Sequence, residues 1–400
     1  MVDIPSLKFW DLDSNQFHQK RILQKIELYK AICQNKDHTR QSLLEELKFR
    51  NTTISNIIKD LIDKNLIFEG ERKSLAGRGR PDYLILPNYN RFLTISAYIV
   101  DRRLFFSLIN INGNVLSERS VDVPDNIDNK GMIDVFKENI SKLSSLVSSN
   151  CEIIGVSILL VGTVDRKNLI WVDIYRWPNI KYLSFKELEE LFHIEINIRR
   201  ILDAELTYLL KINPICSLTS TLIFYWGFGI GAAYSYKGNI LESASGRFTN
   251  VGHTIINMHS DKVCRCGQTG CLETEAAIFG ILPELNKIYP NLKEESLEIQ
   301  KLINEPEVVA LDVIDNAIKY ISVCLMNLHK TLYPKRVYFI GPFFANRKIF
   351  DRIERYILGK LRENEETPEL HLIDEGFGRC QWGGPYEMFE NKILELIKQE

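Results

Sequence analysis

The chain has 400 residues, too many for one ordinary hydrophobic core, so we expect two or three domains. Hydrophobic residues make up 45% and charged residues 26%, and no apolar run approaches the roughly 18 residues that cross a bilayer. The N-terminal stretch MVDIPSLKFWDLDSN is mixed and acidic, unlike a secretory signal, so we expect a cytoplasmic protein that makes no membrane contact.

The net charge of −2 is unevenly distributed along the chain. Residues 14–88 carry 14 Lys and Arg against 9 Asp and Glu, whereas the remainder carries 36 against 43. A basic head on an acidic body is the asymmetry expected when one domain meets phosphates and the other does not.

The first 88 residues show the pattern of a winged helix-turn-helix. Apolar residues at helical spacing predict a helix over 16–35, and Thr39 is a candidate N-cap for a short second helix. A third helix is predicted over 52–65, followed by two short strands around a Gly-rich loop. A small helical interaction module remains the alternative. The polar face of the third helix, which we expect to enter a DNA major groove, consists of Thr52, Thr53, Ser55, Asn56 and Lys59.

The loop between these strands contains Gly77-Arg78-Gly79-Arg80-Pro81. Flanking glycines let the chain lie flat, while Arg78 and Arg80 project cations suited to a narrow, A·T-rich minor groove. The string resembles an AT-hook core, and a flexible linker is the alternative. Residues 82–91 are expected to join the head to the rest of the chain.

From about residue 92 the pattern changes to strands with helices between them, which predicts an α/β body long enough for two lobes. Buried strands are expected at 153–160, 220–225 and 336–340, the last preceded by a long helix over roughly 308–331. The sequence shows no internal repeat.

The eight cysteines are not evenly spread, because Cys264, Cys266 and Cys271 fall within eight residues. In a chain without an export signal this clustering indicates a metal rather than disulfides. With His253 the three thiolates form a closed tetrahedral shell, as in structural zinc sites, and His259 is a competing ligand. Three free thiols on a loop are the alternative.

Several segments in order resemble the ROK family, named for repressors, open reading frames and kinases. They are GVSILLVGTVD (155–165), WPNI (177–180), LDAE (202–205), GFGIGAAYSYKGNI (227–240), VGHTIIN with CRCGQTGCLE (251–273), and LHKTLYPKRVYFIG (328–341). The resemblance implies an α/β fold, with an N-terminal winged helix-turn-helix followed by a two-lobed, actin-like body of the sugar-kinase and ribonuclease-H type. We therefore expect the head at 1–88, a first lobe at 89–200 completed by a C-terminal helix at 385–400, and a second lobe with the zinc site at 201–384.

The resemblance also implies a sugar site. Asn179 and Glu273 match sugar-binding residues, Asp203 matches the carboxylate that acts as the base in the kinases, and His253 matches a histidine shared by zinc and sugar. Two positions depart from the family pattern, with Leu202 for an asparagine and Asn250 for a glutamate. Altered sugar binding is the favoured hypothesis, and a vestigial pocket is the alternative.

The nucleotide site of the family's kinases is not preserved. The first phosphate loop, Asp-Ile-Gly-Gly-Thr in the kinases, has Tyr98 for its aspartate and Asp101 for a glycine, and the second glycine turn has Phe228 for its hydroxyl residue. The glycine run expected after Ile340 is Gly341-Pro342-Phe343. We therefore expect no bound ATP and no enzyme, and we read Asp203 as a vestigial base.

These features together predict a transcriptional repressor of sugar-metabolism genes that responds to a sugar or sugar phosphate in the cleft between its lobes. The expected DNA is an A·T-rich inverted repeat, bound by a homodimer or homotetramer. Two alternatives remain, an active ATP-dependent sugar kinase with a fused DNA-binding head and a ligand-independent repressor.

Overall fold

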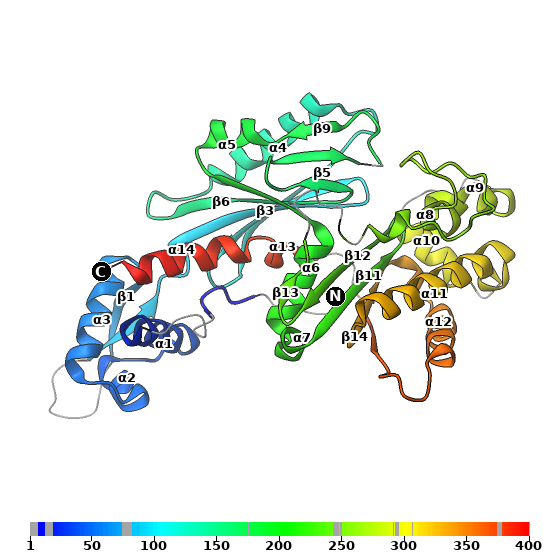
Figure 1. The fold of residues 1–400 in the computed structure, drawn as a ribbon. Coiled ribbons are helices and arrows are strands. Elements are labelled where there is room, and N and C mark those ends of the chain that lie inside the picture. Colours follow the sequence, from blue (N-terminus) through cyan, green and yellow to red (C-terminus); the bar gives the residue numbers. More distant parts are fainter. Residues whose placement is uncertain are drawn as a thin grey trace.

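The computed structural model places a small N-terminal head beside two larger lobes (Figure 1). It describes residues 7–12, 19–73, 82–174, 176–242, 248, 250–290, 292, 296–305, 307–373 and 378–399. Arg78 and Arg80 of the predicted minor-groove segment lie outside the described residues. Among the residues that are described, none of the helices is both long and apolar enough to cross a bilayer.

The head consists of three helices followed by a two-stranded antiparallel hairpin. These are α1 (Lys20–Gln34), α2 (Arg40–Leu47), α3 (Asn51–Asp63), β1 (Ile67–Lys73) and β2 (Asp82–Pro87). Thr39 begins α2 with a capping box, since its side chain accepts from the Ser42 backbone N–H and its own N–H donates to the Ser42 hydroxyl. The apolar face of α3 is buried, as its sequence spacing predicts.

The first lobe is built on a five-stranded sheet of order β10-β6-β3-β4-β5, with β3, β4 and β5 antiparallel and β3, β6 and β10 parallel. Its strands are β3 (Phe92–Val100), β4 (Arg103–Asn110), β5 (Val115–Asp122), β6 (Glu152–Leu160) and β10 (Glu195–Arg200). The helices are α4 (Asn129–Ser144) and α5 (Lys186–Phe192), and a small second sheet contains β7 (Thr163–Asp165), β8 (Ile170–Asp173) and β9 (Lys181–Ser184).

The second lobe repeats this strand topology. Its sheet order is β13-β12-β11-β14-β15, again with one antiparallel meander and two parallel strands beside it. The strands are β11 (Ser220–Trp226), β12 (Ile230–Tyr236), β13 (Asn239–Ile240), β14 (Arg336–Ile340) and β15 (Glu369–Leu372). The helices after the first lobe are α6 (Ile201–Ile212), α7 (Pro214–Leu218), α8 (Leu272–Ala276), α9 (Ile278–Ile288), α10 (Ser296–Ile303), α11 (Asp312–Leu332) and α12 (Arg347–Lys360). Two similar lobes therefore arise without a repeat in sequence, as in actin-like folds.

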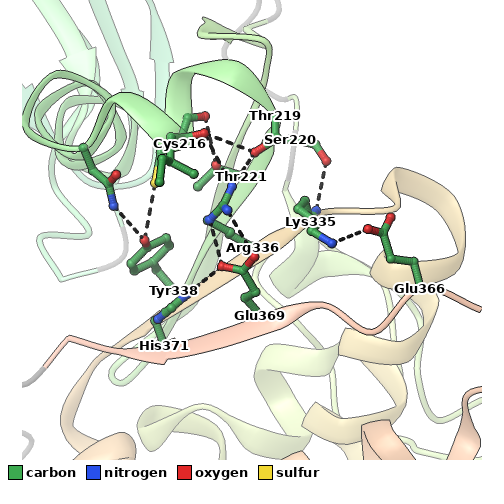
Figure 2. A network of polar contacts seen from close by, with 12 residues as sticks. Cys216, Thr219, Ser220, Thr221, Lys335, Arg336, Tyr338, Glu366, Glu369 and His371 are labelled. Carbon is green, nitrogen blue, oxygen red and sulfur yellow. Dashed lines mark hydrogen bonds and ion pairs between the residues drawn. The ribbon is translucent and has the colours of Figure 1, made fainter.

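A polar network joins the strands at one end of the second sheet (Figure 2). Arg336 on β14 donates to the Thr219 hydroxyl at 2.7 Å and pairs with Glu369 on β15 at 2.9 Å. Tyr338, next on the same side of β14, stacks on His371 with ring centroids 4.7 Å apart. These contacts hold β15, a short edge strand, in register with the rest of the sheet.

The chain ends in α13 (Cys380–Gly383) and α14 (Tyr386–Lys398), which return to the first lobe and the head. Figure 1 shows α14 running between the head and the strands of the first lobe, and it contacts both α1 and β6. Phe9 stacks on Phe389 of α14 with ring centroids 4.3 Å apart. The head and α14 share one hydrophobic core, and because 82–87 form β2, only 88–91 connect the head to β3.

Candidate effector cleft and metal site

A cavity of about 230 Å³ lies between the two lobes. The first lobe contributes the ends of β3, β6 and β10, and the second lobe contributes the turn between β11 and β12 and the segment before α8. Much of the wall is apolar, and a few polar side chains converge on it, which is typical of a small-molecule site. The polar groups that matter below are Asp101, Arg176, Arg200, Asn250, His253 and Glu273.

Beside this cavity, four side chains form a cluster that could hold a metal ion. One ligand atom from each of His253, Cys264, Cys266 and Cys271 lies within 4.8 Å of all the others. The Cys264 sulfur is 3.4 Å from Nδ1 of His253, and the sulfurs of Cys266 and Cys271 are 3.5 Å apart. His259, the competing ligand, is exposed and is not part of this cluster.

Two edges of the cluster are close in length to those of a tetrahedral zinc shell. Zn–S bonds of about 2.3 Å and a Zn–N bond of about 2.0 Å give ligand-to-ligand edges of roughly 3.5–3.8 Å. The two distances above come close to this range. Burial and the neighbouring thiols raise the pKa of Cys271, so a bound cation would be needed to hold the three sulfurs together as thiolates. A β-carbon on Gly270, which has a φ of +73°, would lie 2.1 Å from the Asn257 carbonyl oxygen, so this turn requires glycine.

His253 and Glu273 connect the metal cluster to the cavity, because both line it. Nδ1 of His253 lies 3.9 Å from Oε2 of Glu273, and Oε1 of Glu273 accepts a hydrogen bond of 2.9 Å from the Ile230 backbone N–H. Gly252 permits this approach, since a β-carbon there would lie 2.6 Å from both the Glu273 side chain and the Ile230 carbonyl oxygen. The metal loop thus positions one wall of the cleft.

The other two predicted sugar contacts lie elsewhere. Asp203 is 3% exposed and forms a bidentate pair with Arg200, at 2.8 Å to Nε and 2.6 Å to Nη2. Burial raises the pKa of Asp203, although Arg200 opposes the shift. Asn179 is exposed and donates to the Asn126 carbonyl at 3.2 Å. Neither residue lines the cavity, whereas Leu202 and Asn250, the two departures from the family pattern, both do.

Bulky side chains line the part of the cleft that the family resemblance assigns to the kinases' phosphates. Asp101 lies in the tight turn between β3 and β4 with a φ of +54°, and Tyr98 stacks on Phe105 with ring centroids 5.1 Å apart. Arg176 of the first lobe lies 3.9 Å from Asp101 and places its guanidinium 4.2 Å from the centre of the Phe228 ring in the second lobe. These contacts leave aromatic and charged groups where backbone N–H groups would meet a triphosphate.

The third nucleotide element is also filled by packing. Phe343, in the short 3₁₀ helix Pro342–Ala345, stacks on Trp226 with ring centroids 4.0 Å apart. A β-carbon on Gly341, at a φ of +127°, would lie 2.1 Å from the Trp226 carbonyl oxygen. Arg176 and Arg200 were not among the predicted site residues. The only available signal was that Arg176 directly precedes WPNI and that Arg200 lies two residues before LDAE.

The predicted DNA-reading face lies on the outside of α3. Thr52, Asn56 and Lys59 are exposed, and Thr53 and Ser55 are half-buried. The opposite face of α3, with Ile54 and Leu61 among others, is buried in the head. The helix therefore presents one polar strip to its surroundings.

The ROK family model matches residues 102–379, which is more than half of the chain. The chain belongs to the ROK family. Its curated relatives include the xylose repressor of Bacillus spizizenii, 24% identical over 81% of this chain and 83% of that protein. They also include the DNA-binding transcriptional repressor Mlc of Escherichia coli, 22% identical over 68% of this chain and 66% of that protein.

Solved structures show the same fold. A ROK family transcriptional regulator described as a homolog of Escherichia coli Mlc matches with a TM-score of 0.72 at 19% identity, covering 95% of this chain and 99% of that one. The ROK hexokinase from Thermus thermophilus matches with a TM-score of 0.60 at 16% identity, covering 76% of this chain and 99% of its own. Coverage of 95% must include most of the head, so the regulator shares the complete architecture. The hexokinase leaves about a quarter of this chain unmatched.

Proposed function

We propose that this ROK protein is a DNA-binding transcriptional regulator, a repressor of sugar-metabolism genes that is controlled by a sugar or sugar phosphate in the interlobe cleft. The observation that carries the proposal is the combination of a head with an exposed polar helix face and a sugar-kinase-like body whose cleft carries Asp101 and Phe228 in place of a glycine and a hydroxyl residue. The names of its relatives, xylose repressor, Mlc and the N-acetylglucosamine repressor of Escherichia coli, support this function.

In this proposal α3 lies in the major groove. Asn56 and Lys59 project from its exposed face, and Thr52, Thr53 and Ser55 flank them. Arg78 and Arg80 would enter the adjacent minor groove at A·T-rich steps. Because one head reads one half-site, a homodimer or a dimer of dimers would bind an inverted repeat with half-sites about one helical turn apart.

The effector would bind between the lobes and change their relative position. Glu273 and His253, which line the cavity, would meet sugar hydroxyls there. Asp203 would reach a ligand only after its ion pair with Arg200 breaks. Asn179 would reach a ligand only if the lobes close further. A sugar that binds one lobe arrangement more tightly than the other would shift the balance between the DNA-binding and released forms.

The metal in this proposal is one structural zinc per chain, held by His253, Cys264, Cys266 and Cys271. Zinc with four protein ligands has no open coordination position and stabilises the fold without taking part in chemistry. Its role would be to order the loop between His253 and Cys271, and so to position His253 and Glu273 in the cleft.

An active sugar kinase is the competing function, because the family contains kinases and Asp203 is retained. The pair that Asp203 forms with Arg200 and the acidic Asp101 at the first phosphate loop both oppose it. The deciding experiment is selection of genomic DNA fragments by the purified, zinc-loaded protein, alongside an assay of ATP-dependent phosphorylation of hexoses and pentoses. The proposal expects enrichment of inverted repeats without phosphorylation, whereas the kinase alternative, which also has a DNA-binding head, expects ATP-dependent phosphorylation of a sugar.

A further inference from the structure

The C-terminal helix α14 is held by charged groups at both of its ends. At its C-terminal end, Lys25 of α1 donates to the carbonyls of Ile397 at 3.1 Å and Gln399 at 3.2 Å, and Lys64 donates to the Gln399 carbonyl at 2.7 Å. Ammonium groups are favourable there, because the last carbonyls of a helix carry its negative partial charge. Two residues of the head thus cap the last turn of α14.

The same two lysines are tied to the recognition helix. Asp60 of α3 pairs with Lys25 and with Lys64, both at 2.8 Å. Burial alone would raise the pKa of Asp60, but hydrogen bonds from the two lysines outweigh it and lower the pKa below its ordinary value. The Lys25 side chain is only 4% exposed, and these partners offset the cost of burying its ammonium group. The orientation of α3 is therefore coupled to the end of α14.

At its N-terminal end, α14 contributes Glu387 to a closed square of charges. Arg166 donates to Glu387 at 2.6 Å and to Glu242 at 3.0 Å. Arg199 donates to Glu242 at 2.8 Å and lies 3.4 Å from Glu387. Each arginine thus faces both glutamates, and we call these four residues the ion square.

The ion square joins both lobes to α14. Arg166 follows β7 and Arg199 lies in β10, both in the first lobe, whereas Glu242 follows β13 of the second lobe. Arg199 is 3% exposed, and burial of Glu242 would raise its pKa, but Arg199 and Arg166 lower it below the ordinary value. Separating the lobes would move Glu242 away from a buried arginine, so the square responds to the lobe positions.

The ion square and the cleft are connected through two consecutive residues of β10, Arg199 and Arg200. Arg200, the neighbour of Arg199, lines the cleft, and it pairs with Asp203. Both arginines also line a second, smaller cavity of about 20 Å³ beside Glu242. A ligand that moves Arg200 would therefore disturb the backbone that carries Arg199.

We infer that α14 is the rigid element through which the interlobe cleft controls the orientation of the DNA-reading helix α3. A helix of 13 residues is about 20 Å long and transmits displacement without bending. The ion square holds one end and Lys25 and Lys64 hold the other. This inference rests on the proposed function, and it adds that the head is docked against the body and not a freely tethered module.

The test is amide hydrogen exchange of the full-length protein without DNA or sugar, read by mass spectrometry. Glu242→Gln removes the second-lobe corner of the ion square and touches neither α14 nor the head. We expect about fivefold faster exchange in peptides of α3 and of the last turn of α14, with no change in α12 on the far side of the second lobe. Glu284→Gln, which removes an exposed ion pair with Lys287 in the same lobe, is the matched control.

Faster exchange at the first turn of α14 with wild-type exchange in α3 would overturn the inference, because the change would then be local. Arg166→Gln removes another corner of the ion square and so tests the same link. The Arg166 side chain is 39% exposed, so the fold is expected to tolerate this substitution. If Arg166→Gln accelerates exchange in α12 as much as in α3, the link is refuted.

Coupling is reciprocal, so Lys64→Met is expected to accelerate exchange around β13. None of these readouts uses an operator, so failure of DNA binding and failure of the link are distinguishable.

Discussion

The two halves of the interlobe cleft are lined by different kinds of side chain. In the half beside the metal cluster, His253 and Glu273 line the cavity, and glycines at 252 and 270 permit the close approaches that hold them. In the half that would hold a nucleotide, Arg176 crosses to Phe228, and Phe343 stacks on Trp226. The first half is a polar site supported by a loop, and in the second Arg176 and aromatic rings contact one another along the cavity wall.

This difference indicates which ligand the fold is still suited to hold. Polar groups that converge on a cavity cost stability unless they are used, whereas packed aromatic rings stabilise the fold by themselves. Polar groups in the first half and bulky side chains in the second are what the proposed regulator requires, since it would bind a sugar without transferring a phosphoryl group to it. The following predictions test each half in turn.

The largest effect is expected at the metal cluster. Cys271→Ser removes one of four ligands, and we expect the loss of zinc, destabilisation by several kcal/mol and a melting temperature lower by about 10 °C or more. Metal analysis and calorimetry measure this directly. Cys151→Ser, a half-buried cysteine outside the cluster, is the control and should behave as wild type. Wild-type stability in a chelator would contradict the metal assignment.

The second effect concerns DNA binding. Asn56→Ala removes an exposed side chain from α3, and we expect a loss of about 10- to 100-fold in affinity for a selected operator, with altered base preference. Arg78→Ala with Arg80→Ala should weaken binding mainly at A·T-rich flanks. Anisotropy titrations at one fixed salt concentration measure both. Asn150→Ala, on an exposed loop of the first lobe, is the control, and an equal loss there would exclude α3 as the reader.

The third effect concerns the sugar half of the cleft. Glu273→Gln keeps the size of the side chain and removes its charge, so we expect about tenfold weaker binding of the responding sugar with unchanged zinc content. Calorimetry with D-xylose, D-glucose and N-acetylglucosamine provides the comparison. Asp203→Asn tests whether the Arg200 pair is exchanged on binding. Unchanged affinity in a Glu273→Ala, Asp203→Ala double variant would place the site elsewhere.

The smallest effect is expected in the nucleotide half, where the wild type should transfer no phosphoryl group from ATP to any of these sugars. Asp101→Gly should not restore transfer, because Tyr98, Phe228 and Phe343 still occupy the region. A coupled assay of ADP release detects either outcome. Turnover above background that Asp203→Asn abolishes would establish a kinase.

The parts of the structure that depend on local sequence were predictable. The cap at Thr39, the buried face of α3 and the spacing of the three cysteines each involve residues a few positions apart. The pairs of the ion square, which joins the lobes to α14, were not predictable. Arg166 and Glu387 are 221 positions apart, and neither has a neighbour in sequence that indicates the other. The shared core of the head and α14 was missed for the same reason, because separate amphipathic segments do not specify which surface they cover.

The central claim is that a sugar in the cleft controls DNA binding by the head. The most direct test is an anisotropy titration of full-length, zinc-loaded protein on its selected operator, with and without each sugar at saturating concentration. The account predicts that at least one sugar changes the operator affinity by about tenfold or more, and that Glu273→Gln needs more of that sugar for the same change. The account would be contradicted if no sugar changed the operator affinity. It would also be contradicted if, at every sugar concentration, the operator affinity of Glu273→Gln changed as much as that of the wild type.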